Sequence, residues 1–319
     1  MQPNKQASTL LVIVAFATVY LVWGSTYFFI RVAIQHMPAL ILAFLRFVIA
    51  GILMMAWCAF RGEKIFDWKS IRPAVISGFF LLVIGNGAVV WSETYVPSSL
   101  AAVLASASPV WMVLFDGRNR KANFRSRETI AGLIIGFFGV VLMFSENAKV
   151  ALGSGGSNWE MIALIVLVIG SMSWARGSLY SKYNSTGNSQ TVNTAWQMLS
   201  AGLFFLPISA ASGEWNNFHW TDVTTGSWLA LAYLVVLGSL AGYTAYVWLL
   251  QVRPATQVST HAYVNPVVAV LLGVFIGGES MNFLQVIGLL IILSAVLLIN
   301  ISRYRKSRMV LPVIKNVAC

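Results

Sequence analysis

The hydrophobic pattern of the chain consists of long apolar runs separated by short polar loops. Runs of about 18–25 apolar residues are long enough to cross a bilayer as helices, and ten such runs follow one another here. They are residues 9–34, 38–60, 73–94, 97–115, 128–145, 159–183, 190–212, 227–250, 255–276 and 281–301. We therefore expect an all-α polytopic membrane protein with ten transmembrane helices.

The composition excludes a soluble protein of the same length. Only 10% of the 319 residues are charged, whereas about a quarter of an average soluble chain is charged. Cys58 and Cys319 lie far apart and predict neither a disulfide nor a metal site. The first apolar run lacks a small-residue cleavage site, so we interpret it as a retained span rather than a signal peptide.

The positions of the charges predict an orientation in the membrane. With ten spans, nearly all basic residues between the spans or at their ends fall on one face: Lys5, the 61–72 and 116–127 loops, Lys182, Arg253 and the tail at 302–319. The opposite face has Lys149 and most of the acidic residues. By the positive-inside rule both termini are cytoplasmic. The net charge of +11 is thereby explained by the orientation of the chain in the membrane. The expected partner is the lipid bilayer, not nucleic acid.

The chain also contains an internal duplication. Pro97 and Pro109 are each separated by 157 residues from Pro254 and Pro266, and scarce residues such as Trp91 and Trp248 keep the same register. Repeats of this kind define the architecture. Five spans per half is an odd number, so the second half must be inverted, as in many transporters. We expect five-helix repeats at 9–145 and 159–301, with the four prolines at hinge or packing positions.

A second sequence separation, of 151 residues, relates Trp23 to Trp174 and Arg31 to Lys182. The motif Trp23-Gly24-Ser25-Thr26-Tyr27, followed by Arg31, resembles the first span of the drug/metabolite transporter superfamily. Arg46 with Ala50-Gly51, the proline-bracketed fourth and ninth spans, and Gly277-Gly278-Glu279 are similar to the same family. Its EamA-type exporters, with ten helices in two inverted halves, are the most similar. The first half has no counterpart of Gly277-Gly278-Glu279, which weakens a role for Glu279 by symmetry.

The resemblance implies export of small metabolites, amino acids or drugs across a bacterial-type plasma (inner) membrane. Ionisable groups at membrane depth are candidates for function because burying them is costly. Arg46, about eight residues into the second span, is the deepest, and we expect it to bind an anionic group such as a substrate carboxylate. Bonding to helix carbonyls is the alternative. Arg31 and Arg176 are further candidates, although Arg31 could snorkel and Arg176 could be a positive-inside charge.

Other candidates for the cavity lining are polar or aromatic. His261 is the one group in the ninth span that titrates near neutral pH, and a buried neutral histidine is the alternative. The remaining candidates are Trp23, Asn86, Trp91, Trp174, Tyr243, Trp248, Tyr263 and Asn265. Interhelical hydrogen bonds, worth about 0.6 kcal/mol each, are the alternative for the polar residues. No Asp or Glu lies at mid-membrane depth, which favours facilitated exchange or coupling through another group.

These observations predict a secondary transporter that moves a small molecule by alternating access between the two repeats. A facilitative importer or exchanger is the alternative. A membrane enzyme would need paired carboxylates, a Ser–His couple or a metal set inside the spans, and the sequence shows none, so we expect no catalytic residue, metal or cofactor. A receptor would not need matched halves, and a channel would need rings of like charge. Both monomer and homodimer remain open.

Overall fold

The computed structural model describes residues 8–143, 145, 158–185, 189–216, 218–277 and 283–315. The regular structure of these residues is entirely helical. The first half contains α1 (Thr9–Ala33), α2 (Ala39–Phe60), α3 (Trp68–Gly78), η1 (Phe79–Asn86), α4 (Gly87–Ser92), α5 (Ser98–Ala105), α6 (Ser108–Phe115), α7 (Arg120–Arg125) and α8 (Arg127–Met143). The second half contains α10 (Asn158–Asn184), α11 (Gln190–Ala211), η2 (Trp220–Asp222), α12 (Thr225–Tyr233), η3 (Leu234–Tyr243), α13 (Thr244–Val252), α14 (Ala255–Val258), α15 (His261–Gly277) and α16 (Phe283–Lys315).

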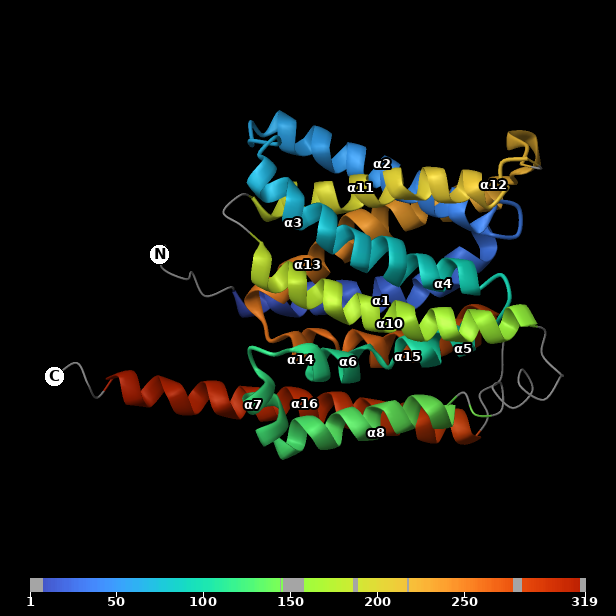
Figure 1. The fold of residues 1–319 in the computed structure, drawn as a ribbon. Helices are drawn as coiled ribbons and strands as arrows, with labels where there is room; N and C mark the ends of the chain where they lie inside the picture. The colour runs from blue at the N-terminus through green and yellow to red at the C-terminus, as the bar shows by residue number, and fades with distance from the viewer. Residues whose placement is uncertain are drawn as a thin grey trace.

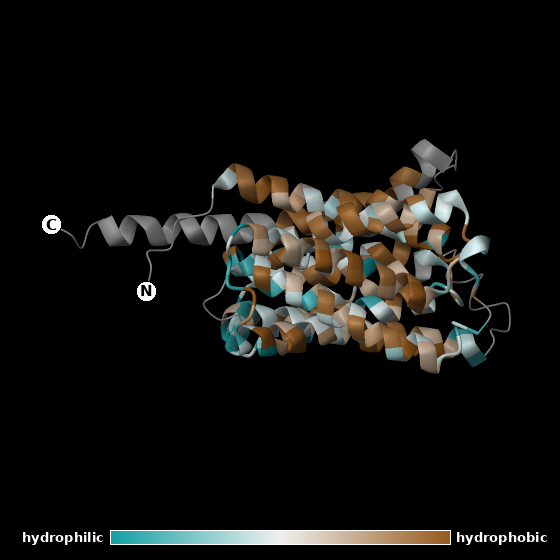
Figure 2. Ribbon diagram, turned by 90° about the horizontal axis from the view of Figure 1, so that it is seen from above, coloured by the Kyte–Doolittle hydropathy of each residue, from teal (hydrophilic) through white to brown (hydrophobic). Residues whose placement is uncertain are grey.

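The helices form a polytopic membrane bundle. Six continuous helices in the described ranges are long and apolar enough to cross a membrane, and they match six of the predicted runs: α1, α2, α3 through α4, α10, α11, and α12 through α13. Large apolar side chains such as Phe60 and Phe138 are 86% and 61% exposed. Figure 2 shows that the hydrophobic residues run along the middle of the helices and the hydrophilic ones gather at the ends. Such a surface suits lipid as its solvent.

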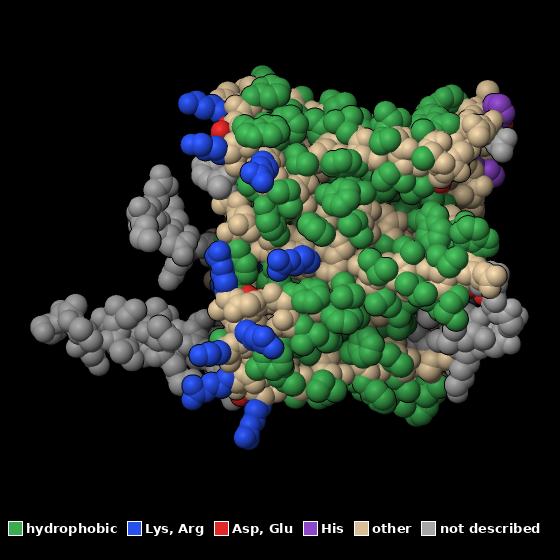
Figure 3. Space-filling model, viewed as in Figure 1, with side chains coloured by type: hydrophobic (Ala, Val, Ile, Leu, Met, Phe, Trp, Pro, Cys, Tyr) green, Lys and Arg blue, Asp and Glu red, His purple; other side chains and the backbone are tan. Residues whose placement is uncertain are grey.

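The charges lie at the two ends of the bundle. On the face drawn in Figure 3, Lys and Arg side chains gather at one end, which we call the basic end, and histidines lie at the opposite end. The exposed residues of the basic end include those of the 61–72 and 116–127 loops. This separation follows the pattern read from the sequence.

Two predicted single helices are broken in the structure. The run 97–115 divides into α5 and α6 around Ser106, and the run 255–276 divides into α14 and α15 around Ser259. Pro109 has no N–H to donate to the carbonyl four residues earlier, and the Ser108 hydroxyl donates to that carbonyl, Ala105 O, at 2.6 Å. In the second half the break comes before Pro266, and side chains again take the freed carbonyls, as the Thr260 hydroxyl does for Gln257 O.

The prediction for the ends of these helices is confirmed within one residue. Pro97 is the N-cap of α5, and Pro254 is the N-cap of α14. Proline suits this position because the first helical N–H groups have no partner in the helix. The motif residue Glu279 and its neighbours 278–282 lie outside the described residues.

Helices from the two halves pack against each other in pairs. Figure 1 shows α2 beside α11 at one side of the bundle and α8 beside α16 at the other. Gly51 of α2 and Gly202 of α11 are repeat partners, and each lies against the backbone of the opposite helix. A Cβ at Gly51 would lie 2.6 Å from Leu199 Cα, and one at Gly202 would lie 2.6 Å from Val48 N. The two glycines make the same close approach from opposite sides of one interface.

Candidate functional site

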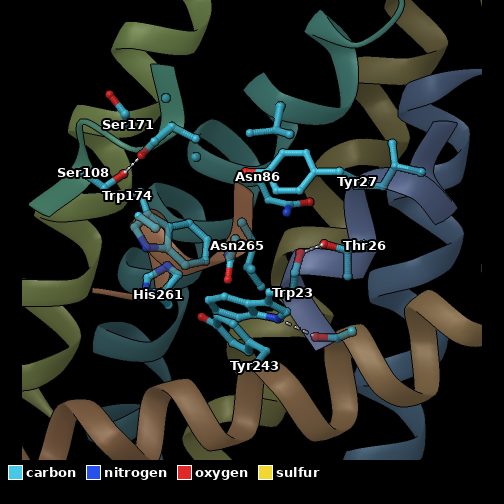
Figure 4. A pocket seen from close by; sticks show the side chains of 18 of the residues that line it. Trp23, Thr26, Tyr27, Asn86, Ser108, Ser171, Trp174, Tyr243, His261 and Asn265 are labelled. Carbon is cyan, nitrogen blue, oxygen red and sulfur yellow. Dashed lines mark hydrogen bonds between the residues drawn. The ribbon is translucent and has the colours of Figure 1, made fainter. Parts of the chain in front are cut away.

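A cavity of about 90 Å³ lies inside the bundle, between α1, α2, η1, α10, η3 and α15. Figure 4 shows side chains that line it and labels ten of them. Its polar and aromatic lining consists of Trp23, Thr26, Tyr27, Arg46, Phe47, Asn86, Ser108, Ser171, Trp174, Tyr243, His261 and Asn265. Both halves of the chain contribute to this lining, which is what a site at a repeat interface requires.

Arg46 is the charged group of the cavity lining. It is 4% exposed, and its Nε donates to Ser239 Oγ at 2.9 Å. Its Cζ lies 5.0 Å from the centre of the Phe47 ring, close enough for a cation–π contact. The buried Nη1, however, has no hydrogen-bond partner. A buried guanidinium with a free N–H is a ready donor to an anion entering the cavity.

The π-helical segment η3 holds this guanidinium and the indole of Trp23. Trp23 Nε1 donates to Gly238 O at 3.0 Å. A Cβ at Gly238 would lie 3.0 Å from Arg46 Nη2, and one at Gly242 would lie 2.6 Å from Trp23 Nε1. Glycine at these two positions therefore leaves room for the guanidinium and the indole where they lie, and a larger residue would require them to shift. Short π-helical segments are frequent at functional sites, and the first half has one, η1, at the corresponding place.

Unpaired acceptors also line the cavity. Asn86 Oδ1 and Asn265 Oδ1 are buried and have no hydrogen-bond partner. His261 Nδ1 lies 3.0 Å from Val258 O. Because a carbonyl can only accept, Nδ1 carries the proton, and Nε2 is left as an acceptor. The cavity therefore offers a free donor on Arg46 and free acceptors on the residues of η1 and α15.

An aromatic cluster forms one wall. The rings of Trp23 and Trp174, which are repeat partners, lie 5.4 Å apart in an edge-on arrangement. Tyr246 packs against both rings, and its hydroxyl accepts from Trp174 Nε1 at 3.0 Å. Since both indole N–H groups are bonded within the protein, this wall presents mainly apolar surface to a ligand.

The structure brings together seven of the twelve predicted residues at this cavity, and the other five lie elsewhere. The seven are Trp23, Arg46, Asn86, Trp174, Tyr243, His261 and Asn265. Arg176 is exposed on α10 and points away from the bundle interior. Arg31 is exposed as well, and its Nη1 donates to Glu93 O at 2.9 Å. Tyr263 is buried on another face, where its hydroxyl donates to Leu133 O at 2.9 Å.

The two remaining predicted residues, Trp91 and Trp248, are repeat partners that pack partly buried against the hydrophobic core. Each lies on the same continuous span as a cavity residue, but at a position that the helical turn directs elsewhere. The matching of Trp91 to Trp248 in sequence reflects equivalent packing in the two halves.

Sequence reasoning missed Gln197, although a signal for it was present. Gln197 is separated from Arg46 by the same 151 residues that relate Trp23 to Trp174. It is 2% exposed, accepts from the Tyr243 hydroxyl at 2.9 Å and donates to Ser77 Oγ at 2.8 Å. Where the first half has a guanidinium with a free N–H, the second half has an amide bonded inside the protein.

Comparison with known proteins agrees with this architecture. The model of the EamA-like transporter family matches residues 10–145 and 161–301. The uncharacterized inner membrane transporter YedA of Escherichia coli (strain K12) is 34% identical over 296 residues, which cover 91% of this chain and 90% of YedA. Protein PecM of Dickeya dadantii (strain 3937) is 24% identical over 302 residues, or 91% of this chain and 93% of PecM.

A solved crystal structure has a similar fold. It superposes with a TM-score of 0.70 at 17% identity, over 92% of this chain and 97% of that one. The likeness at this identity concerns the fold alone. The resemblance to the drug/metabolite transporter superfamily is confirmed by the family match over both halves. The chain belongs to the EamA-like transporter family.

Proposed function

We propose that this membrane transporter exports small metabolites that carry a carboxylate, such as amino acids or related amphipathic solutes, or drugs of similar chemistry. The free Nη1 of Arg46 inside the cavity is the observation on which the proposal rests. A hydrogen bond to a charged group contributes about 1.5–3 kcal/mol. A solute with a carboxylate would complete the hydrogen bonding of the guanidinium and neutralise its charge.

The other groups of the cavity fit the remaining parts of such a solute. The unpaired oxygens of Asn86 and Asn265 are acceptors for the N–H groups of an amine or amide. Trp23 and Trp174 offer an apolar wall to a hydrophobic side chain. In our proposal Arg46 fixes the anionic end of the solute, the two asparagines its nitrogen, and the indoles its apolar body.

Transport would proceed by alternating access between two inverted repeats at 9–145 and 159–301. In our proposal four further apolar segments also cross the membrane and bring the number of spans to ten: α5 with α6, α8, α14 with α15, and α16. The two segments matched by the family model support the repeat boundaries. In Figure 1, α1 begins and α16 ends at the basic end of the bundle. Together with the positive-inside rule, this supports our proposal that both termini and the tail 302–319 are cytoplasmic.

The test is untargeted mass spectrometry of cells and medium. Cells producing the native protein are compared with cells producing Arg46→Ala at equal abundance in the membrane. We expect a few carboxylate-bearing solutes to accumulate in the medium and fall inside the cells only with the native protein. Depletion of those solutes from the medium would replace export by uptake. Identical metabolite profiles would contradict the proposal.

A further inference from the structure

Glu93 is a buried carboxylate that the transport site described above does not use. It follows directly after the span Trp68–Ser92, at the end of the bundle opposite the basic end. It is 0% exposed. Its Oε2 accepts from Ser98 Oγ at 3.1 Å, whereas its Oε1 is buried and has no partner. A charged carboxylate with an unpaired oxygen is costly in such a place, so the surroundings favour the neutral acid.

The neighbours of Glu93 connect it with the cavity and with solvent. Tyr27 of α1 interacts electrostatically with Glu93 and lines the cavity. Arg31, one helical turn further along α1, is exposed and donates to the main-chain oxygen of Glu93, not to its carboxylate. Burial raises the pKa of Glu93 to about 8, while the Ser98 hydrogen bond and the charge of Arg31 act in the opposite direction.

The other helices packed against α4 add few charges near this carboxylate. η1 and α5 contain no charged residue, and Arg46 is the one charged residue of α2. α10 has Glu160 near this end, and its side chain is partly exposed. The protonation of Glu93 therefore depends on its burial, on Arg31 and on whether water reaches it.

The second half contains the same helix-end contact without the carboxylate. Lys182, the repeat partner of Arg31, donates to Leu250 O and Arg253 O at the basic end. Leu250 is separated from Glu93 by the same 157 residues that relate the prolines. A cation thus holds the carbonyl end of α4 at one end of the bundle and that of α13 at the other, an arrangement that suits the helix dipole. In the first half the residue whose carbonyl accepts also has a titratable side chain, Glu93, whereas Leu250 takes this place in the second half and the carboxylate near Lys182 is that of Asp116.

We propose that Glu93 is a proton-binding site and that proton binding there keeps the cavity closed at the end of the bundle opposite the basic end. The neutral acid is compatible with burial, and it leaves Arg31 on the main-chain oxygen of Glu93. Loss of the proton to water at this end creates a buried carboxylate. That carboxylate gains by hydration and by pairing with Arg31, so Arg31 leaves the carbonyl and the end of α4 separates from α1. The inference rests on the proposed transport function, for which this end must open.

The test measures access to the cavity and requires no transported solute. Val89 lines the cavity one turn before Glu93. A Val89→Cys reporter, with Cys58 and Cys319 replaced by Ala and Ser, is labelled in nanodiscs with a charged methanethiosulfonate reagent between pH 6 and pH 9. Thiol reactivity also increases with pH, so each rate is divided by the rate of the same reporter combined with Glu93→Gln at the same pH.

A group with a pKa of about 8 is about 1% charged at pH 6 and about 90% charged at pH 9. We expect the ratio of the two rates to rise at least about fivefold over this range, because the open population follows the charged fraction. Asp222→Asn, which removes an exposed carboxylate at the same end, should leave the rise unchanged. A constant ratio, or loss of the rise in Asp222→Asn, would overturn the proposal.

An infrared titration of the native protein covers the case in which Glu93→Gln does not fold. A protonated buried carboxylic acid gives a separate carbonyl band, which should disappear with a midpoint near pH 8 as Glu93 loses its proton. Absence of such a band at pH 6 would contradict the proposal. Both measurements keep their meaning if the export experiment fails, so the two failures can be told apart.

Discussion

Replacing Gly51 by alanine tests whether the contact between α2 and α11 is as close as the structure shows. The added Cβ would lie 2.6 Å from Leu199 N and from Leu199 Cα. Carbon atoms in contact prefer separations of about 3.5–4.0 Å. Because the atoms in the way belong to backbone, they cannot be displaced by a rotamer change. The two helices must therefore separate by roughly 1 Å, which forfeits about a quarter to a half of the dispersion energy along the contact.

The expected cost follows from two opposing terms. Overpacking a well-packed interior typically costs about 1–3 kcal/mol, and a clash with backbone belongs at the upper end of this range. Alanine gains about 1 kcal/mol over glycine in helix propensity. We therefore expect Gly51→Ala to destabilise the protein by about 2 kcal/mol. The assay is thermal unfolding of the purified protein in detergent, where a decrease of several degrees in the midpoint is expected.

Two further variants make this prediction specific. A Cβ at Gly117 would meet nothing within 4 Å, so Gly117→Ala should change stability by less than about 0.5 kcal/mol. Gly202→Ala should destabilise like Gly51→Ala, and the double variant should lose less than the sum, because one separation relieves both clashes. Equal midpoints for Gly51→Ala and Gly117→Ala, or strict additivity of the pair, would refute the reasoning.

Three other substitutions have expected outcomes. Ser239→Ala removes the acceptor for Arg46 Nε. Export should fall by about 5- to 150-fold, because an unsatisfied buried donor costs about 1–3 kcal/mol. The abundance of the protein, measured in parallel, should stay near native. Trp23→Phe keeps an aromatic wall but loses the indole bond to η3, so export of the same solutes should persist at a reduced rate, and complete loss would assign the indole a larger role. Lys182→Met removes the contact with Leu250 O. A cysteine reporter placed at the basic end of the cavity should then react faster with a thiol reagent. An unchanged labelling rate would exclude a closing role for this lysine.

Much of the fold could be predicted because its signals are local or repetitive. The length of the apolar runs predicted the six continuous spans that the structure shows. The 151-residue spacing predicted that Trp23 and Trp174 occupy equivalent places, and the two rings are in contact in the structure. The breaks after Ala105 and Val258 were missed because they depend on side-chain hydroxyl and imidazole groups that take over main-chain carbonyls. An apolar run looks the same whether or not it is broken in this way.

The site was harder to predict because the depth of a residue in the membrane does not determine the direction in which its side chain points. Arg46 and Arg176 both lie within spans, yet one lines the cavity and the other is exposed. The difference depends on the rotation of each helix against its neighbours, and the small hydrophobic asymmetry around these helices does not reveal it. Glu93 lies at the end of the run 73–94 and was counted with the acidic residues of the face opposite the basic loops, because the sequence does not show that packing buries it completely.

The most direct measurement of the central claim compares Arg46→Ala with Arg176→Ala in the same export assay. Both substitutions remove one arginine from a membrane-spanning helix, but only Arg46 places a free N–H in the cavity. Solutes in the medium are measured by mass spectrometry at equal membrane abundance of the two variants. The account predicts loss of carboxylate export for Arg46→Ala and native export for Arg176→Ala. Native export for Arg46→Ala, or equal loss in both variants, would contradict it.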